Sequence, residues 1–406
     1  MKEQTLTNKI NLYSLYLLCF SISFHKKAIA PLIIIFLITS LVNGDYRFKE
    51  KSKNILFFTT IFIVYAIGML YSENISYGLK DLETKLSLLV FPIAFFISKI
   101  NFRSMLETTL KWFIIGLILS SITCLVEAIY QFNVTGDENE FFYYKLSLFH
   151  HTSYISMYLN LGIIICYHFL FQQSKSLVFK KVYAVSIITF FTIMIVMLSA
   201  KTGIITMLIT HGFAITYWAI KTKSYLKSLL IINLIVFSFF AAYQSSSIFN
   251  ARIKEAVSTL LSSNRSKTST TAVRIDTWKT SLEIISVKPF LGYGTGDVKD
   301  VIMNKYKEKE LHHLIETKLN PHNQFLQTTI AIGLLGCVIF ILLLFIPTYH
   351  SVKRKEMLLP FFILLFSISM LTESMLETQS GVIFYAFFNS LLFISYFPNK
   401  AQLPNK

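Results

Sequence analysis

Arg274 and His322 are the residues whose types and positions in this chain best suit catalysis. The planar guanidinium of Arg274 can bind two oxygens of one phosphate group. His322 precedes a long apolar run, and Asn323 after it is a good cap for a helix N-terminus. Such a terminus disfavours the charged imidazolium and attracts phosphate, so His322 could accept a proton beside an anion. The alternatives are a solvated loop arginine and a histidine that only caps a membrane helix.

Lys201 and His151 are further candidates, because each stands where an apolar run begins. Lys201 could supply a second cation for the same anion. It could equally extend to a membrane surface, as long basic side chains often do. His151 could be an ordinary histidine at a membrane interface. Neither residue indicates a function by itself.

The sequence contains no pattern that is typical of a metal or nucleotide site. It lacks a Walker motif and a His-Glu-x-x-His pair. The glycine-rich run at 292–296 follows a predicted helix and lacks the spacing of a dinucleotide fingerprint. The loose acidic cluster Asp137, Glu138 and Glu140 is the nearest approach to a set of metal ligands. We therefore expect no metal and no cofactor.

Composition indicates which elements must position these residues. Of 406 residues, 54% are hydrophobic and 15% are charged, and the mean hydropathy is +0.56. Soluble domains carry about 25% charged residues, and a membrane-spanning helix needs about 20 mostly apolar residues. The sequence predicts an all-α polytopic membrane protein with about twelve transmembrane helices. The candidate spans are 10–24, 28–43, 54–71, 82–98, 111–131, 152–171, 183–200, 203–220, 228–244, 323–347, 357–372 and 381–397.

One long polar segment interrupts the apolar runs. Within it, Ile275, Trp278, Leu282 and Ile285 recur at helical spacing, which predicts an amphipathic helix over 272–287. Pro289 ends this helix, and a second charged amphipathic segment covers 300–318. The predicted organisation is a transmembrane bundle of about nine helices, one large loop and about three final helices, at 1–244, 245–322 and 323–406.

The distribution of basic residues predicts the orientation. Lysine and arginine are concentrated in alternate short loops, such as 47–53, 99–111 and 353–355, which places both termini in the cytoplasm. Only the turn at Lys26 and Lys27 opposes this bias. Long loops cross membranes regardless of charge, so the segment 245–322 faces outward. The net charge of +16 then follows from topology and this basic loop, and does not indicate nucleic-acid binding.

Four ordered motifs resemble the O-antigen ligase and O-antigen polymerase family. They are RIDTW at 274–278, KPFLGYGTG at 288–296, PHNQFLQ at 321–327 and GLLG at 333–336. HTSY at 151–154 is a looser element. The motifs cover roughly 200–336, and the N-terminal half matches mainly in hydropathy. Family members often carry arginine where this chain has Lys201. Lysine keeps the positive charge but lacks the paired donors with which arginine binds two oxygens.

The resemblance implies a metal-independent glycosyltransferase in the inner membrane, with its active site facing the periplasm. Its donor would be a glycan on undecaprenyl pyrophosphate, and its acceptor a sugar hydroxyl of lipid A–core. In this interpretation His322 is the general base, and Arg274 and Lys201 bind the pyrophosphate. His151 and Asn323 are further candidate site residues. Membrane lipids surround the protein.

Three alternatives remain open. A polymerase of O-antigen or exopolysaccharide, or a protein O-oligosaccharyltransferase, would use the same donor and differ only in its acceptor. A polysaccharide transporter belongs to a different class. Transporters usually show internal repeats and ionisable residues near the bilayer midplane. This chain shows no evident repeat, and its candidate residues cluster at one predicted face, which favours the enzyme.

Overall fold

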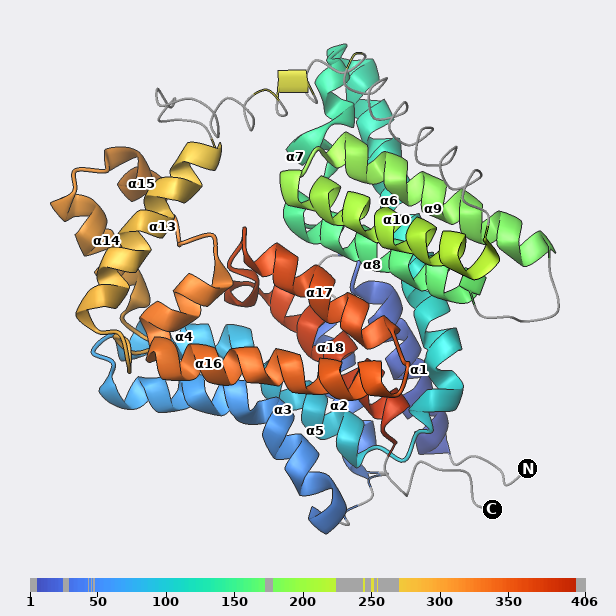
Figure 1. Ribbon diagram of the computed structural model, residues 1–406, viewed down its shortest axis with the longest axis horizontal. Helices are drawn as coiled ribbons and strands as arrows, with labels where there is room; N and C mark the ends of the chain where they lie inside the picture. Colours follow the sequence, from blue (N-terminus) through green and yellow to red (C-terminus); the bar gives the residue numbers. More distant parts are fainter. Residues whose placement is uncertain are drawn as a thin grey trace. The chain divides into compact units, whose positions relative to one another are not determined.

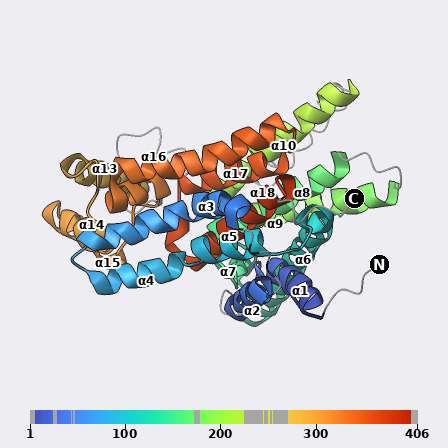
Figure 2. The ribbon, with the colours of Figure 1, turned by 90° about the horizontal axis from the view of Figure 1, so that it is seen from below.

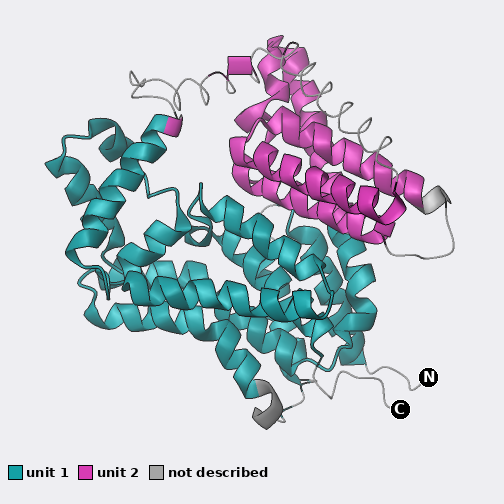
Figure 3. Cartoon of the chain, viewed as in Figure 1, with its two compact units in different colours: residues 1–113, 272–406 teal, residues 114–271 magenta. Residues whose placement is uncertain are grey.

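The computed structural model describes residues 6–24, 29–42, 48–171, 178–223 and 270–398, with single residues at 44, 46, 244, 250, 251 and 254. Every regular element in these ranges is a helix (Figure 1). The predicted all-α architecture is therefore confirmed for the described residues. The chain divides into two compact units, one made of residues 1–113 and 272–406 and the other of residues 114–271 (Figure 3).

The first unit combines two stretches that are far apart in the sequence. Its N-terminal stretch contains α1 (Leu6–Ser21), α2 (Ile29–Val42), α3 (Phe48–Gly68), η2 (Met69–Tyr71), α4 (Ile75–Lys85), α5 (Ser87–Ile97) and the start of α6 (Phe102–Thr135). Its C-terminal stretch contains most of α13 (Thr270–Val287), then α14 (Val298–Glu308), α15 (His312–Thr317), α16 (Gln324–Lys353), α17 (Leu358–Met370), η4 (Met375–Glu377) and α18 (Gln379–Tyr396).

The second unit is a continuous stretch of sequence. It contains the rest of α6, then η3 (Glu138–Phe141), α7 (Tyr143–Leu146), α8 (Thr152–Phe171), α9 (Val178–Leu198) and α10 (Lys201–Thr222). Helix α8 packs against both α9 and α10. Gly162 of α8 allows the close approach of α9, because a side chain there would press against the ring of Phe191.

Helix α5 is central to the packing of the first unit, because its sequence is almost entirely apolar. It packs against α2, α3 and α18. Phe95 of α5 meets Phe387 of α18 edge to face, with ring centroids 5.4 Å apart, and Phe91 meets the same ring at 5.5 Å. Lipid tails are as apolar as these side chains, so close packing rather than the hydrophobic effect drives helix association in a membrane.

Helix α16 runs beside α3 (Figures 1 and 2) and is broken at Ile332 and Gly333. Gly333 has a φ of +69°, and a side chain there would overlap the carbonyl oxygen of Phe290. The break frees backbone groups of α16, and the segment 289–294 pairs with them. The glycine-rich turn therefore docks the end of α13 against α16. The bonds run from Tyr293 N to Ile330 O, from Gly294 N to Ala331 O and from Leu334 N to Pro289 O, at 2.7 to 2.9 Å.

Eleven of the twelve predicted apolar runs coincide with helices, and the run 228–244 lies outside the described residues except for residue 244. Six described helices are long and apolar enough to cross a membrane, which is the property of a multi-pass membrane protein. The count of twelve spans, the orientation and the division at 244 and 322 stay predictions. The six are Ser52–Tyr71, Phe102–Thr135, Thr152–Phe171, Lys181–Leu198, Lys201–Thr222 and Gln324–Lys353.

The long polar segment is helical where it is described. The predicted helix at 272–287 is confirmed as α13. Its predicted apolar face is wrong, because Leu282 is exposed while Thr277, Thr280 and Ser281 are buried. The predicted segment 300–318 forms two helices instead of one, because Glu310 adopts a left-handed backbone conformation between them. The predicted run 82–98 is likewise divided, since α4 ends at Lys85 and α5 begins at Ser87. Most of 245–269 lies outside the described residues.

Candidate functional site

Glu373 brings the two leading candidates together within the first unit. His322 Nδ1 lies 2.7 Å from Glu373 Oε1, within hydrogen-bonding distance. An Arg274 guanidinium nitrogen lies 3.5 Å from Glu373 Oε2, which makes an ion pair. The Glu373 side chain is 10% exposed, against 23% for Arg274 and 22% for His322. One buried carboxylate thus contacts both of the side chains that the sequence singles out.

Local hydrogen bonds hold His322 at the start of α16. Its backbone has a φ of +48°, a left-handed conformation that is uncommon outside glycine. The side chain of Asn320 supports this turn by accepting a hydrogen bond from His322 N at 2.9 Å. The predicted cap is confirmed, because Asn323 Oδ1 accepts from the backbone N–H groups of Phe325 and Leu326. These bonds fix the direction in which the imidazole leaves the backbone.

Two further bonds join the segments that carry the three side chains. Asn323 Nδ2 donates to the carbonyl of Leu371 at 3.1 Å, which ties the start of α16 to the loop that carries Glu373. The buried hydroxyl of Thr277 on α13 lies 3.2 Å from the carbonyl of Pro321, and 2.8 Å from that of Arg274. Arg274, His322 and Glu373 are therefore held by three packed segments rather than by one flexible loop.

The pairing with Glu373 determines which nitrogen of His322 can act as a base. An ionised carboxylate only accepts hydrogen bonds, so Nδ1 carries the proton in this arrangement. The neutral ring then presents Nε2 as its acceptor nitrogen. This is the arrangement in which a carboxylate orients a catalytic imidazole and stabilises it once it is protonated.

A second ionic cluster in the same unit reaches the first residue of α16. Lys85 is fully buried and pairs with Asp81 at 2.6 Å and with Glu377 at 3.0 Å. Gln324, the first residue of α16, joins the cluster, since its amide nitrogen lies 3.3 Å from Glu377 Oε1 and its oxygen accepts from Leu376 N at 2.6 Å. The cluster thus connects α4, α16 and the loop that carries both glutamates.

Burial and charge act differently on the two carboxyls of this cluster. Burial raises the pKa of Asp81 to about 7, although Lys85 opposes the shift. Burial also acts to raise the pKa of Glu377, but the charge of Lys85 and the hydrogen bonds that Glu377 accepts lower it overall. Lys85 and Glu377 form a pair of opposite charges. Asp81 is the member of the cluster that titrates near neutral pH.

Lys201 and His151 lie in the second unit. Lys201 is the first residue of α10, and its ammonium group donates a hydrogen bond to Thr271 Oγ1 at 3.0 Å. His151 is exposed just before α8, and its Nδ1 is 3.4 Å from Ser153 N. Their membership of one site with Arg274 and His322 stays a prediction. In the loose acidic cluster, Asp137 and Glu140 both pair with Lys145. The part of the chain that the structure describes contains no group of three metal-ligating side chains.

The comparisons with known proteins agree with these motifs. The family model described as O-antigen ligase matches residues 184–341. The predicted family resemblance is confirmed. An uncharacterised protein of Haemophilus influenzae is 28% identical over 109 residues, which are 26% of each chain. Proteins of Rickettsia typhi and Rickettsia prowazekii, each named "Putative polysaccharide ligase", are 37% and 35% identical over 79 residues, 18% of this chain and 19% of theirs.

The O-antigen ligase match covers only part of the site. It contains Lys201, Arg274, His322 and Asn323, whereas Glu373 and the Lys85 cluster lie outside it. The aligned segments span about a quarter or less of the length of these relatives. Residues 184–341 thus resemble the O-antigen ligase family, and the apolar helices are those of a multi-pass membrane protein.

Proposed function

We propose that this chain transfers a glycan from undecaprenyl pyrophosphate to a sugar hydroxyl of lipid A–core at the periplasmic face of the inner membrane. The observation that carries the proposal is the contact of Glu373 with both His322 and Arg274. It gives one site a base, a carboxylate that orients it and a cation for phosphate. The O-antigen ligase match over 184–341 supports the reaction class.

The reaction is a displacement at the anomeric carbon of the donor sugar. His322 Nε2 removes the proton of the acceptor hydroxyl as its oxygen attacks that carbon. The bond from the carbon to the pyrophosphate oxygen breaks, and its electron pair stays on the pyrophosphate. The proton remains on His322, beside Glu373, until solvent takes it. General-base catalysis of this kind contributes about 10²- to 10⁴-fold in rate.

The leaving pyrophosphate needs positive charge where its own charge develops. Arg274 can provide two parallel hydrogen bonds to it. Its contact with Glu373 is an ion pair of 3.5 Å. Lys201 is the proposed second cation. In this mechanism fixed side chains do the work that a divalent ion does in other transferases, and no metal or cofactor is needed.

The glycan profile of a strain that lacks the chain tests this function. We expect lipid-linked glycan to accumulate and core-linked polymer to disappear, with recovery on expression of the wild-type chain. His322→Ala and His322→Gln should fail to restore the polymer, since neither side chain can carry the proton. His312→Gln is the matched control, because His312 is an exposed histidine on α15.

Three other profiles would indicate a different function. A core that carries single repeat units would indicate the polymerase, and loss of glycan from proteins alone would indicate the protein O-oligosaccharyltransferase. Lipid-linked glycan trapped on the cytoplasmic side would indicate the transporter. An unchanged profile in the deletion strain would contradict all four functions. Normal profiles with both His322 variants would contradict the catalytic role of His322.

A further inference from the structure

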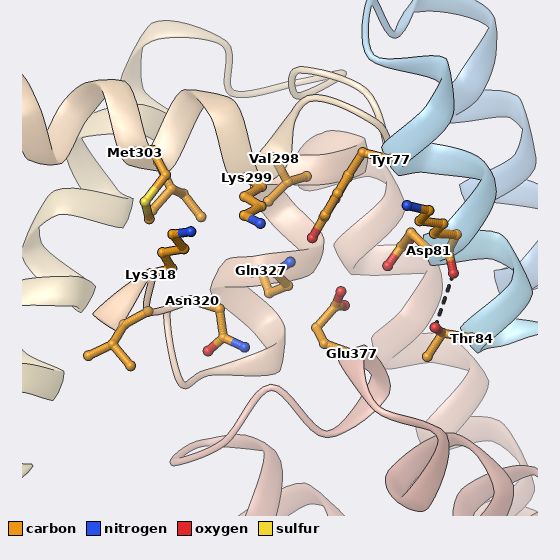
Figure 4. A pocket seen from close by; sticks show the side chains of 13 residues that line it. Tyr77, Asp81, Thr84, Val298, Lys299, Met303, Lys318, Asn320, Gln327 and Glu377 are labelled. Carbon is orange, nitrogen blue, oxygen red and sulfur yellow. Dashed lines mark hydrogen bonds between the residues drawn. The ribbon is translucent and has the colours of Figure 1, made fainter. Parts of the chain in front are cut away.

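A cavity of about 280 Å³ lies in the first unit, next to the loop that carries His322 (Figure 4). Its walls come from α4, α14, the start of α16, the loop at 318–320 and the end of η4. Drug-sized ligand pockets occupy roughly 300–1,000 Å³, so this volume suits about one sugar ring. The mechanism proposed above does not use this cavity.

Gln327 shows that the cavity is built for a polar ligand. Its side chain lies within the cavity wall and is only 4% exposed. Its carbonyl oxygen has no hydrogen-bond partner among the described residues. A buried polar atom without a partner is destabilising, so native structures rarely keep one without a reason. A ligand hydroxyl in the cavity would supply the missing bond. Figure 4 shows Gln327 facing the same space as Tyr77 and Glu377.

The charges around the cavity are predominantly positive. Lys80, Lys299 and Lys318 are exposed where they line it, and none of the three forms an ion pair with a described residue. The carboxyls of Asp81 and Glu377 also line the cavity, but both contact the buried ammonium of Lys85. Even with both carboxyls ionised, these two negative charges are outnumbered by Lys85 and the three exposed lysines, so the net charge is positive. The cavity therefore favours an anionic ligand.

The cavity shares its walls with the candidate active site. Asn320 lines it and also accepts the hydrogen bond from the backbone N–H of His322. Gln327 stands on the first turn of α16, which His322 and Asn323 precede. Glu377 is the last residue of η4, which begins two residues after Glu373, the partner of His322. A sugar bound in the cavity would be one ring of a glycan, and a hydroxyl of the neighbouring ring would reach His322.

We propose that this cavity binds one sugar ring of the acceptor glycan, and that this ring carries a carboxylate or a phosphate. Gln327 and Asn320 recognise its hydroxyls, and Lys80, Lys299 and Lys318 recognise its charge. We assign the bound ring to the acceptor and not to the donor, because the cavity adjoins His322, which removes the acceptor's proton. The inference rests on the proposed function for that choice alone. The cavity's preference for an anionic sugar stands on its own geometry.

Saturation-transfer NMR on the purified full-length chain in detergent measures this preference directly. The probes are glucuronate, glucose 6-phosphate and glucose. We expect saturation of the charged sugars to be at least severalfold stronger than that of glucose. The variant K299Q/K318Q should lose most of this difference. K307Q is the matched control, since Lys307 is an exposed lysine of α14 outside the cavity. Equal signals from all three sugars, or no change in K299Q/K318Q, would overturn the proposal. Whichever charged probe binds better identifies the anionic group.

Gln327→Met separates binding from folding. It removes an unpaired buried amide and keeps a similar volume, so the melting temperature should be equal or higher, while glucuronate binding falls severalfold. A large drop in melting temperature would mean that Gln327 serves the fold, and would contradict its role in recognition. K299Q/K318Q still tests the charged part of the proposal in that case.

A transfer assay then distinguishes this inference from the proposed function. K299Q/K318Q should raise the acceptor KM severalfold at an unchanged donor KM. A raised donor KM would overturn the assignment to the acceptor. His322→Ala should keep glucuronate binding while losing transfer. If neither the wild-type protein nor any variant transfers glycan, yet glucuronate still binds, the proposed function fails and the anionic sugar site remains supported.

Discussion

His322 Nδ1 lies 2.7 Å from a carboxylate oxygen of Glu373, although the two residues are 51 positions apart in the sequence. The histidine comes from the loop before α16, and the glutamate comes from the loop after α17. The bond between Asn323 and the carbonyl of Leu371 joins the same two loops. Two helix ends therefore have to pack correctly before the imidazole has its partner. The orientation of the proposed base is a property of the folded unit, and not of the local motif.

Glu373→Gln tests this relationship. The amide can still meet Nδ1 but no longer carries the charge that stabilises a protonated imidazole. We expect kcat to fall on the order of 10²-fold, with the donor KM nearly unchanged. Steady-state transfer kinetics on purified protein measure both values. Glu316→Gln, on the exposed face of α15, is the matched control and should behave as wild type. A normal kcat in Glu373→Gln would mean that the carboxylate is not needed.

Arg274→Ala removes the proposed ligand of the leaving pyrophosphate. We expect transfer to fall on the order of 10²- to 10³-fold, because a charged donor at a developing charge is lost. Arg274→Lys should recover only part of the activity, since lysine lacks the fork. Arg103→Ala is the control, because Arg103 is exposed and an ion pair such as that with Glu356 contributes little at the surface. Full transfer by Arg274→Ala at matched expression would show that Arg274 is a solvated residue that does not bind the pyrophosphate.

Local signals made part of the site predictable from the sequence. The cap at Asn323 depends on neighbouring residues, and it was confirmed. Glu373 could not be identified in the same way, because it stands between two apolar runs like any acidic loop residue. Its significance comes from a contact with His322 across 51 positions. Lys85 shows the same limit, since its pairing with Asp81 is local but its pairing with Glu377 spans 292 positions.

The fold shows a similar division between local and distant causes. Long apolar runs predicted most of the helices correctly, because length and hydropathy are local properties. The break in α16 was not predictable from the run around Gly333. Glycine is frequent in membrane helices, so its presence alone does not indicate an interruption. The break depends on the carbonyl of Phe290, which a distant segment brings against the helix.

Asp81 gives a prediction for the dependence of stability on pH. Its folded pKa of about 7 lies above the ordinary value of 3.8, so the folded state binds the extra proton. The stability from this group is complete below about pH 4 and is lost as the pH rises through 7. Asp81→Asn cannot titrate and keeps a neutral side chain. We therefore expect its melting temperature to rise relative to wild type between pH 5 and pH 8, as measured by thermal unfolding in detergent.

Asp300→Asn is the control for this measurement, since Asp300 is an exposed residue of α14. Its difference from wild type should stay constant between the two pH values. Lys85→Met should destabilise the protein at pH 8 by about 3–5 kcal/mol, because two carboxyls then lose their buried partner. A difference between Asp81→Asn and wild type that stays constant from pH 5 to pH 8 would show that Asp81 is ionised in the folded state throughout this range, and would contradict the raised pKa.

Gly333→Ala tests whether the break in α16 positions the site. The left-handed backbone at this residue costs a side chain about 1–3 kcal/mol, and the overlap with the carbonyl of Phe290 adds to that. We expect a lower melting temperature and a loss of transfer, because the segment that docks α13, and with it Arg274, is displaced. Gly212→Ala is the matched control. Gly212 lies inside α10 with open space around it, so alanine there should be neutral or stabilising by up to about 1 kcal/mol. If both variants melt and transfer like wild type, α16 tolerates a continuous helix at 333, and the break has no part in holding Arg274 near His322.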